Sequence, residues 1–313
     1  MNSDRRLPRL DRERIFIGDG GVETTMIFDV GIELPLFASF LLLGDRVGTD
    51  ALRTYYRSYL ALAHRYGVGF TLDTPTWRAS RDWGQQLGYS PHDLAEVNRA
   101  AVRFGEQIRA AEETDQTPIA VCGTIGPRGD AYDPVAAMSP QVAEQYHATQ
   151  IQTFAEAGAD MVSAYTLAYA EEAIGIVRAA TASGIPVSIS FTIETDGLLP
   201  SGQSVGDAIG QVDAATGGAP AYFMINCAHP THFGPVVKQG GAWLARLGGV
   251  RANASAKSHA ELDQATELDS GDPDALGAEY RALKPYLGST RVLGGCCGTN
   301  ALHVARICEG WLS

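Results

Sequence analysis

Residues 291–299, RVLGGCCGT, join a short apolar segment to a turn that contains glycines and two adjacent cysteines. The segment Arg291–Gly295 does not alternate polar with apolar residues, which is typical of a parallel strand covered on both faces. Longer helical patterns separate it from seven similar segments, at Phe16–Gly20, Gly69–Thr74, Ile119–Thr124, Met161–Thr166, Val187–Thr192, Tyr222–Cys227 and Leu247–Asn253. Eight strands alternating with helices predict a closed (β/α)8 TIM barrel rather than an open doubly wound sheet.

Helix start signals support this alternation. Ser90, Pro91 and Asp93 form an N-cap, a first-turn proline and a reciprocal capping residue before a long amphipathic pattern, and Ser139-Pro140 opens another. The polar, acidic stretch Ser255–Gly277 is expected to be an extended loop over the top of the barrel. No linker or repeat divides the chain, so we expect one domain over residues 1–313.

Composition excludes several classes of protein. The net charge is −12, and no basic stripe is present that would bind a nucleic acid. No apolar run reaches the ~18 residues that span a bilayer, and the N-terminal MNSDRRLPRLDRER lacks the apolar region of a secretory signal. We therefore expect a cytoplasmic protein whose five cysteines are reduced and serve as thiols or metal ligands. The sequence does not predict an oligomeric state.

The unusual residues of the chain fall at the ends of the predicted strands. In a barrel of this kind the carboxyl ends of the strands form the active site. These ends are Gly18–Gly21, Asp73–Trp77, Gly123–Pro127, Ile225–Pro230 and Gly294–Thr299. Asp19, between glycines, is either an ordinary turn residue or a substrate contact at the mouth of the barrel.

The pair Cys296-Cys297 is the strongest signal for a metal site. Adjacent side chains on a regular strand point to opposite faces, but the flanking glycines permit a sharp turn that brings the two sulfurs together. Cys227, at the end of another strand, would supply a third thiolate. Three thiolates leave one position of a tetrahedral Zn2+ open, as in catalytic zinc sites. The alternative is that these cysteines are buried core residues, which is the interpretation we favour for Cys122 and Cys308.

His229 and His232 are near enough to Cys227 in sequence to be considered as zinc ligands. With three cysteines available, we expect them to be polar wall or loop residues instead.

Four motifs in this order resemble those of the homocysteine S-methyltransferases: GDGG at 18–21, GTIGPRG at 123–129, INC at 225–227 and GGCCGT at 294–299. The similarity runs from about Ile15 to Leu312. GGCCGT together with an upstream INC is highly specific, whereas GDGG alone would be weak.

The resemblance implies a single-barrel enzyme in which Cys227, Cys296 and Cys297 bind zinc. It further implies that the thiol of the acceptor is the fourth ligand. Coordination deprotonates a thiol, and the thiolate then attacks the methyl group of a cationic donor. The resemblance also places Asp19, with the backbone at Gly20 and Gly21, against the amino-acid part of the acceptor. Asn226 of the INC motif is a further expected substrate contact.

One departure from the family pattern affects the acceptor. After the fourth strand the family has a glutamate that binds the ammonium group of the acceptor, and Tyr165 occupies that position here. A neutral phenol cannot replace the ion pair. Either another carboxylate, such as Glu194 or Glu23, takes over, or the acceptor is not homocysteine itself. In the second case Tyr165→Glu is expected to improve the use of homocysteine.

The methyl donor is expected to be an onium compound. Trp77 could attract an onium methyl group by cation–π interaction, and Arg78 could bind a carboxylate of the donor. The alternative is a tryptophan packed beneath a loop beside an exposed arginine. A folate donor is disfavoured because the chain has no room for a second barrel or a cobalamin module. Two other functions stay open, a non-catalytic zinc- and thiol-binding homologue and, with less support, a zinc hydrolase.

Overall fold

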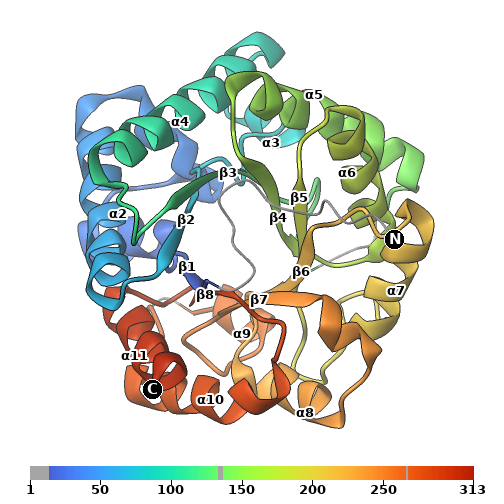
Figure 1. The fold of residues 1–313 in the computed structure, drawn as a ribbon. Helices are drawn as coiled ribbons and strands as arrows, with labels where there is room; N and C mark the ends of the chain where they lie inside the picture. Colours follow the sequence, from blue (N-terminus) through green and yellow to red (C-terminus); the bar gives the residue numbers. More distant parts are fainter. Residues whose placement is uncertain (1–13, 133–136, 266) are drawn as a thin grey trace.

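The computed structural model describes residues 14–132, 137–265 and 267–313. In these residues, eight parallel strands form a closed barrel in chain order, with the last strand paired to the first (Figure 1). They are β1 (Phe16–Ile17), β2 (Gly69–Asp73), β3 (Ile119–Ile125), β4 (Met161–Leu167), β5 (Val187–Phe191), β6 (Tyr222–Asn226), β7 (Leu247–Ala252) and β8 (Val292–Gly295). The predicted TIM barrel is confirmed. The largest difference from the predicted strands is at β1, which ends at Ile17 rather than Gly20.

The long helices form a ring outside the strands (Figure 1). The helices of the described residues are α1 (Val22–Thr24), α2 (Arg46–Tyr66), α3 (Arg81–Gln86), α4 (Pro91–Glu112), α5 (Pro140–Ala157), α6 (Ala170–Ala182), α7 (Val205–Thr216), α8 (Pro230–Gln239), α9 (His259–Asp263), α10 (Pro273–Leu283) and α11 (Ala301–Leu312). Short segments of 3-10 or π-helix add η1 (Thr25–Val30), η2 (Pro35–Phe37), η3 (Ser39–Gly44), η5 (Ala242–Arg246) and η6 (Lys284–Tyr286). Among the described helices, none combines the length and the apolar character that crossing a membrane requires.

The strands are buried on both faces, as their apolar sequences predict. Every residue of β3 is buried. Alternate residues of this strand, Ala120 and Cys122, pack with Phe16 and Met224 in a cluster separate from the large core between strands and helices. We assign this smaller cluster to the barrel interior because alternate strand residues point inward. Cys122 and Cys308 are fully buried, which confirms their expected place in the core.

The predicted helix caps are present. Ser90 accepts a hydrogen bond from the Asp93 amide at the start of α4, the Asp93 side chain completes the capping box, and Ser139 caps α5. The expectation of a loop over the whole of Ser255–Gly277 is wrong. A capping box of Ser258 and Glu261 starts α9, and α10 begins at Pro273 within this stretch. The N-terminal stretch that was expected to lack a secretory signal covers residues 1–14. Of these, residues 1–13 lie outside the described residues.

Candidate active site

A cavity of about 450 Å3 opens at the carboxyl ends of the strands. All the site residues predicted from the sequence lie in its wall: Asp19, Gly20, Gly21, Trp77, Arg78, Tyr165, Asn226, Cys227, Cys296 and Cys297. Residues of the segment between β7 and α10, including those of α9, line its rim. The barrel therefore gathers residues from both ends of the chain around one space.

The three cysteines at the ends of β6 and β8 converge. The sulfurs of Cys227, Cys296 and Cys297 all lie within 4.8 Å of one another. Two backbone features allow this arrangement. Cys227 itself has a left-handed conformation with φ of +51°, and Gly298 beyond the pair has φ of +76°. The turn therefore brings together side chains that a regular strand would point to opposite faces.

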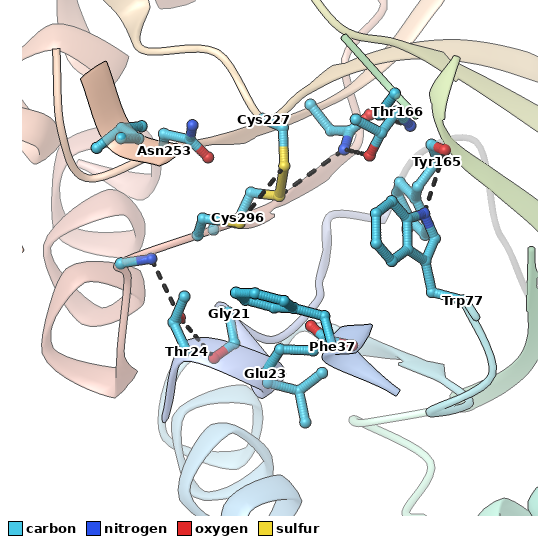
Figure 2. Close-up of a pocket in the computed structure, with 18 of the residues that line it drawn as sticks. Gly21, Glu23, Thr24, Phe37, Trp77, Tyr165, Thr166, Cys227, Asn253 and Cys296 are labelled. Atoms are coloured by element: carbon cyan, nitrogen blue, oxygen red, sulfur yellow. Dashed lines mark hydrogen bonds between the residues drawn. A yellow bond between two sulfur atoms is a disulfide. The ribbon is translucent and has the colours of Figure 1, made fainter. Parts of the chain in front are cut away.

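Glycines let the loop after β1 approach the cysteine turn closely. A Cβ atom on Gly21 would lie 2.8 Å from the carbonyl oxygen of Cys296, and one on Gly20 would lie 2.5 Å from that of Thr299. In Figure 2, Gly21 and Thr24 lie beside the turn that carries Cys296. The GDGG and GGCCGT motifs therefore contact each other directly, and the close approach leaves no room for a side chain at Gly20 or Gly21.

Cys227 and Cys296 are joined by a disulfide, in contrast to the expectation that all five cysteines are reduced (Figure 2). Cys297 is a free thiol exposed to the cavity. The physical reason for the difference is proximity, because thiols that are close enough to share a cation are also close enough to be oxidised in pairs. Reduction of this bond would free both sulfurs as metal ligands.

The spacing of one pair of sulfurs, those of Cys227 and Cys297, fits a zinc ion. With Zn–S bonds near 2.3 Å, tetrahedral geometry separates two sulfur ligands by about 3.8 Å. The sulfurs of Cys227 and Cys297 are 3.8 Å apart. Although Cys297 is exposed to the cavity, the surrounding cavity walls shield its thiol from bulk water, and this desolvation, assisted by the nearby Glu23 carboxylate, raises its pKa to about 12. This thiol therefore stays protonated at neutral pH unless a cation offsets the effect of burial.

Asn226 supports the cysteine cluster. Its amide nitrogen donates to Thr166 Oγ1 at 2.9 Å and is 3.8 Å from the sulfur of Cys296, and its oxygen accepts from the Thr166 amide and Ser190 Oγ. Thr166 adopts φ of +62°, a left-handed conformation that this pairing stabilises. Asn226 thus lines the cavity, as predicted, but its polar atoms are engaged with the protein.

A buried ionic network lines the same cavity as the cysteines. The Arg251 guanidinium forms ion pairs with Asp19 and Asp73, donates to Tyr165 Oη at 3.0 Å, and donates to the carbonyl of Gly295 at 3.1 Å. All three charged residues are at most 6% exposed. Asp19 also accepts from Tyr55 Oη at 3.0 Å. Asp19 is therefore at the mouth of β1 as predicted, with both carboxylate oxygens already hydrogen-bonded.

The other predicted contacts surround the cavity. Trp77 Nε1 donates to the carbonyl of Tyr165 at 3.4 Å. The Arg78 guanidinium carbon lies 4.0 Å from the ring centre of Trp77 and 3.6 Å from that of Trp83. Among the described residues, Arg78 Nε and Nη1 have no hydrogen-bond partner, and burial lowers the pKa of this arginine to about 10. Arg78 is thus sandwiched between two indoles rather than exposed beside a packed Trp77.

The histidines near Cys227 are not part of the cysteine cluster. His229 accepts from the Thr231 amide as the N-cap of α8, and burial lowers its pKa to about 4. His232 Nε2 is 2.9 Å from the carbonyl oxygen of Ala256. Within the described ranges, the one group of His, Cys, Asp and Glu side chains close enough to share an ion consists of the three cysteines. This is the arrangement predicted from the sequence.

The two carboxylates considered as replacements for the missing glutamate are differently placed. Glu23 lines the cavity, but its carboxylate accepts from Ser39 Oγ at 2.8 Å, and burial raises its pKa. Glu194 is 3.0 Å from His259 Nδ1 and does not line the cavity.

Asp73, Arg251 and Phe37 also line the cavity, and none of them was predicted from the sequence as a site residue. The sequence did contain a signal for Arg251, which lies inside the apolar segment Leu247–Asn253. A charged residue in such a strand is rarely buried without a partner, so its position indicates a buried ion pair. Asp73 ends β2 at the rim, where functional residues gather. Phe37 had no comparable signal, since its place at the cavity depends on a loop with φ of +55° (Figure 2).

Comparisons with known proteins identify the family of the chain. Residues 16–310 match the family model for homocysteine S-methyltransferase. Betaine–homocysteine S-methyltransferase 1 of Bos taurus is 25% identical over 97% of this chain and 74% of its own length. The homocysteine methyltransferase MmuM of Escherichia coli has the same fold. Its oxidised form has a TM-score of 0.73 at 20% identity, over 94% of this chain and 95% of its own. Its metallated form has a TM-score of 0.72 at 19% identity, over 95% and 96%. The chain is an S-methyltransferase and belongs to the homocysteine S-methyltransferase family.

Proposed function

We propose that this protein transfers a methyl group from an onium donor to homocysteine, with Zn2+ held by Cys227, Cys296 and Cys297. The observation that carries the proposal is the convergence of three sulfurs at the mouth of the barrel with cavity space beside them. Zn2+ bound there would make the acceptor thiol a thiolate at neutral pH.

The residues around the cysteines are suited to keep this cluster in place. Asn226 lies against the sulfur of Cys296 and is locked by Thr166 and Ser190. His259 Nε2 is 2.7 Å from the carbonyl oxygen of Cys227, and its ring stacks on Tyr132 at 3.7 Å. Such outer contacts orient the ligands and limit the access of water.

The opposite wall is suited to an onium donor. The rings of Trp77 and Phe37 border the cavity (Figure 2), and an aromatic face attracts a cationic methyl group. Arg78, held by stacking and with free N–H groups, supports a donor that also carries a carboxylate.

The transfer itself is a displacement at the methyl carbon. The acceptor sulfur forms a bond to that carbon while the bond from carbon to the onium heteroatom breaks. The electron pair stays on the leaving heteroatom, which becomes neutral, and the thiol proton is lost to solvent. The contribution of the protein is to hold donor and acceptor in line inside a cavity of about 450 Å3.

The test combines product analysis with metal analysis. Reduced, zinc-loaded protein is incubated with homocysteine and a panel of sulfonium and quaternary ammonium donors, and methionine is measured by mass spectrometry. We expect methionine with at least one donor, and about one zinc per chain. Cys296→Ala and Cys297→Ala should lose both zinc and activity, while Cys122→Ala and Cys308→Ala should keep the zinc.

Three results would count against the proposal. Full zinc occupancy in Cys227→Ala and Cys296→Ala would exclude the metal site. Zinc and homocysteine binding without methionine would indicate a non-catalytic thiol-binding protein. Release of a hydrolysed product without methyl transfer would indicate a hydrolase. The cytoplasmic location and the lack of a nucleic-acid partner stay predictions from composition.

A further inference from the structure

We propose that Asp73, on β2, binds the ammonium group of the amino-acid acceptor in place of the glutamate that Tyr165 replaces on β4. This inference rests on the proposed function, because it concerns how the same site recognises homocysteine. It assigns a specificity-determining role to a residue outside the motifs that identify the family.

The first observation is where the Tyr165 side chain ends. Its hydroxyl donates to Asp73 Oδ2 at 2.9 Å and accepts from Arg251 Nη1 at 3.0 Å. The phenol therefore extends from β4 to β2 and meets a carboxylate there. Asp73, Tyr165 and Arg251 all line the cavity that contains the cysteines. The cavity wall therefore still has a carboxylate beside the Tyr165 hydroxyl, although this carboxylate comes from β2 and not from β4.

The second observation is which polar groups of Arg251, Asp19 and Asp73 already have hydrogen-bond partners. The five N–H groups of Arg251 match five contacts: two to Asp19, one to Asp73, one to Tyr165 and one to Gly295. Both carboxylate oxygens of Asp19 are bonded, one to Arg251 and the other to Tyr55. In contrast, Asp73 Oδ1 is buried and has no hydrogen-bond partner among the described residues. Asp73 is therefore the carboxylate of this network with an oxygen that lacks a hydrogen-bond partner, and it is also a residue of the cavity wall.

The third observation is the charge of the network. One guanidinium faces two carboxylates, which leaves one negative charge in excess. Burial outweighs the effect of Arg251 and raises the pKa of Asp73 to about 6. A cation with N–H donors beside Oδ1 would supply both the missing charge and the missing hydrogen bond. A primary ammonium group has this chemistry, whereas a fully methylated onium group has no N–H to donate.

The other nearby carboxylates are less suited. Glu23 accepts from Ser39, and Glu194, which does not line the cavity, is paired with His259. Tyr165 and Arg251 hold Oδ2 of Asp73 from two sides, so Oδ1 has a defined position before any ligand binds. Such preorganisation is what a selective contact needs.

The experiment compares homocysteine with 4-mercaptobutyrate, which is the same molecule without the amine. Dissociation constants are measured by titration calorimetry on reduced, zinc-loaded protein, and kcat/KM is measured separately. We expect the unmodified protein to prefer homocysteine. In Asp73→Asn the affinity for homocysteine should fall about ten- to a hundred-fold, while that for 4-mercaptobutyrate should change less than about threefold.

Asp19→Asn is the matched control, since it also removes a carboxylate partner of Arg251. It should affect both thiols alike. If Asp73→Asn does not fold, Tyr165→Phe provides the second test, with a several-fold loss of selectivity for homocysteine and unchanged zinc content. Equal losses for both thiols in Asp73→Asn, selective loss in Asp19→Asn, or a selective gain for homocysteine in Tyr165→Glu would overturn the inference.

The two proposals can fail separately. Methyl transfer to both thiols without preference would refute the role of Asp73 and leave the proposed function intact. Homocysteine binding that depends on Asp73, without methyl transfer from any donor, would refute the function and leave the assignment of Asp73 intact.

Discussion

Replacing Arg251 by methionine tests whether the ionic network is a single buried unit. The substitution keeps a long apolar side chain but removes the guanidinium that pairs with Asp19 and Asp73. Two carboxylates are then left in a buried site without a counter-charge. Removing one partner of a buried ion pair typically costs about 3–5 kcal/mol. For a chain of this size that corresponds to a fall in Tm of about 5–8 °C.

The loss should depend on pH in a defined direction. Burial already raises the pKa of Asp73 to about 6 with Arg251 present, and loss of the guanidinium raises it further. An acid whose pKa is higher in the folded than in the unfolded protein destabilises the fold above its folded pKa. This effect disappears as pH falls toward the unfolded pKa, near 4. The defect of Arg251→Met should therefore be full at pH 8 and at most about half as large at pH 5.

The assay is thermal and urea unfolding of both proteins at the two pH values. Arg46→Met is the control, because Arg46 is 92% exposed and pairs with Asp50 within one helix. It should change stability by less than about 0.5 kcal/mol. A loss below about 1 kcal/mol in Arg251→Met, or the same loss at pH 5 and pH 8, would show that the network does not carry buried charge as described.

Two further predictions concern ligands. The ratio of affinities for homocysteine and 4-mercaptobutyrate should rise by up to about tenfold between pH 5 and pH 7 as Asp73 ionises. The change can be assigned to Asp73 because the pKa values of its neighbours Arg251, Tyr165 and Cys122 lie far above this range. Calorimetry at both pH values checks this, and a flat ratio would contradict it. Arg78→Met should raise KM about ten- to a hundred-fold for an onium donor that carries a carboxylate and leave KM for a carboxylate-free sulfonium nearly unchanged. Equal changes in steady-state kinetics with both donors would assign Arg78 a packing role only.

Much of the fold could be predicted from local patterns. The eight strands were recognisable because burial on both faces requires continuous apolar residues. The Ser90 cap was recognisable because its partner Asp93 is three residues away. The prediction failed where a short signal was missed, at the Ser258–Glu261 capping box that starts α9. Burial decided the strands, and local hydrogen bonding decided the two helix starts.

The positions of the three cysteines could be anticipated for a topological reason. Parallel strands in a barrel all end on the same rim, so residues that follow strands meet there whatever their separation in sequence. Cys227 and Cys296 are 69 residues apart and adjacent in space. The sequence by itself therefore determined the barrel and the candidate metal ligands.

Only the tertiary structure decided the partners within the barrel. Arg251 lies 232 residues from Asp19 and 178 from Asp73, and nothing local to either aspartate indicates which of them keeps a free oxygen. The difference arises because Tyr55 on α2 donates to the Asp19 oxygen that Arg251 leaves free. Tyr165 on β4 instead donates to the same Asp73 oxygen that Arg251 contacts. Strand order determines which residues share the rim, but the side-chain conformations and the sharing of one guanidinium determine their hydrogen bonds. These depend on all the packed elements together.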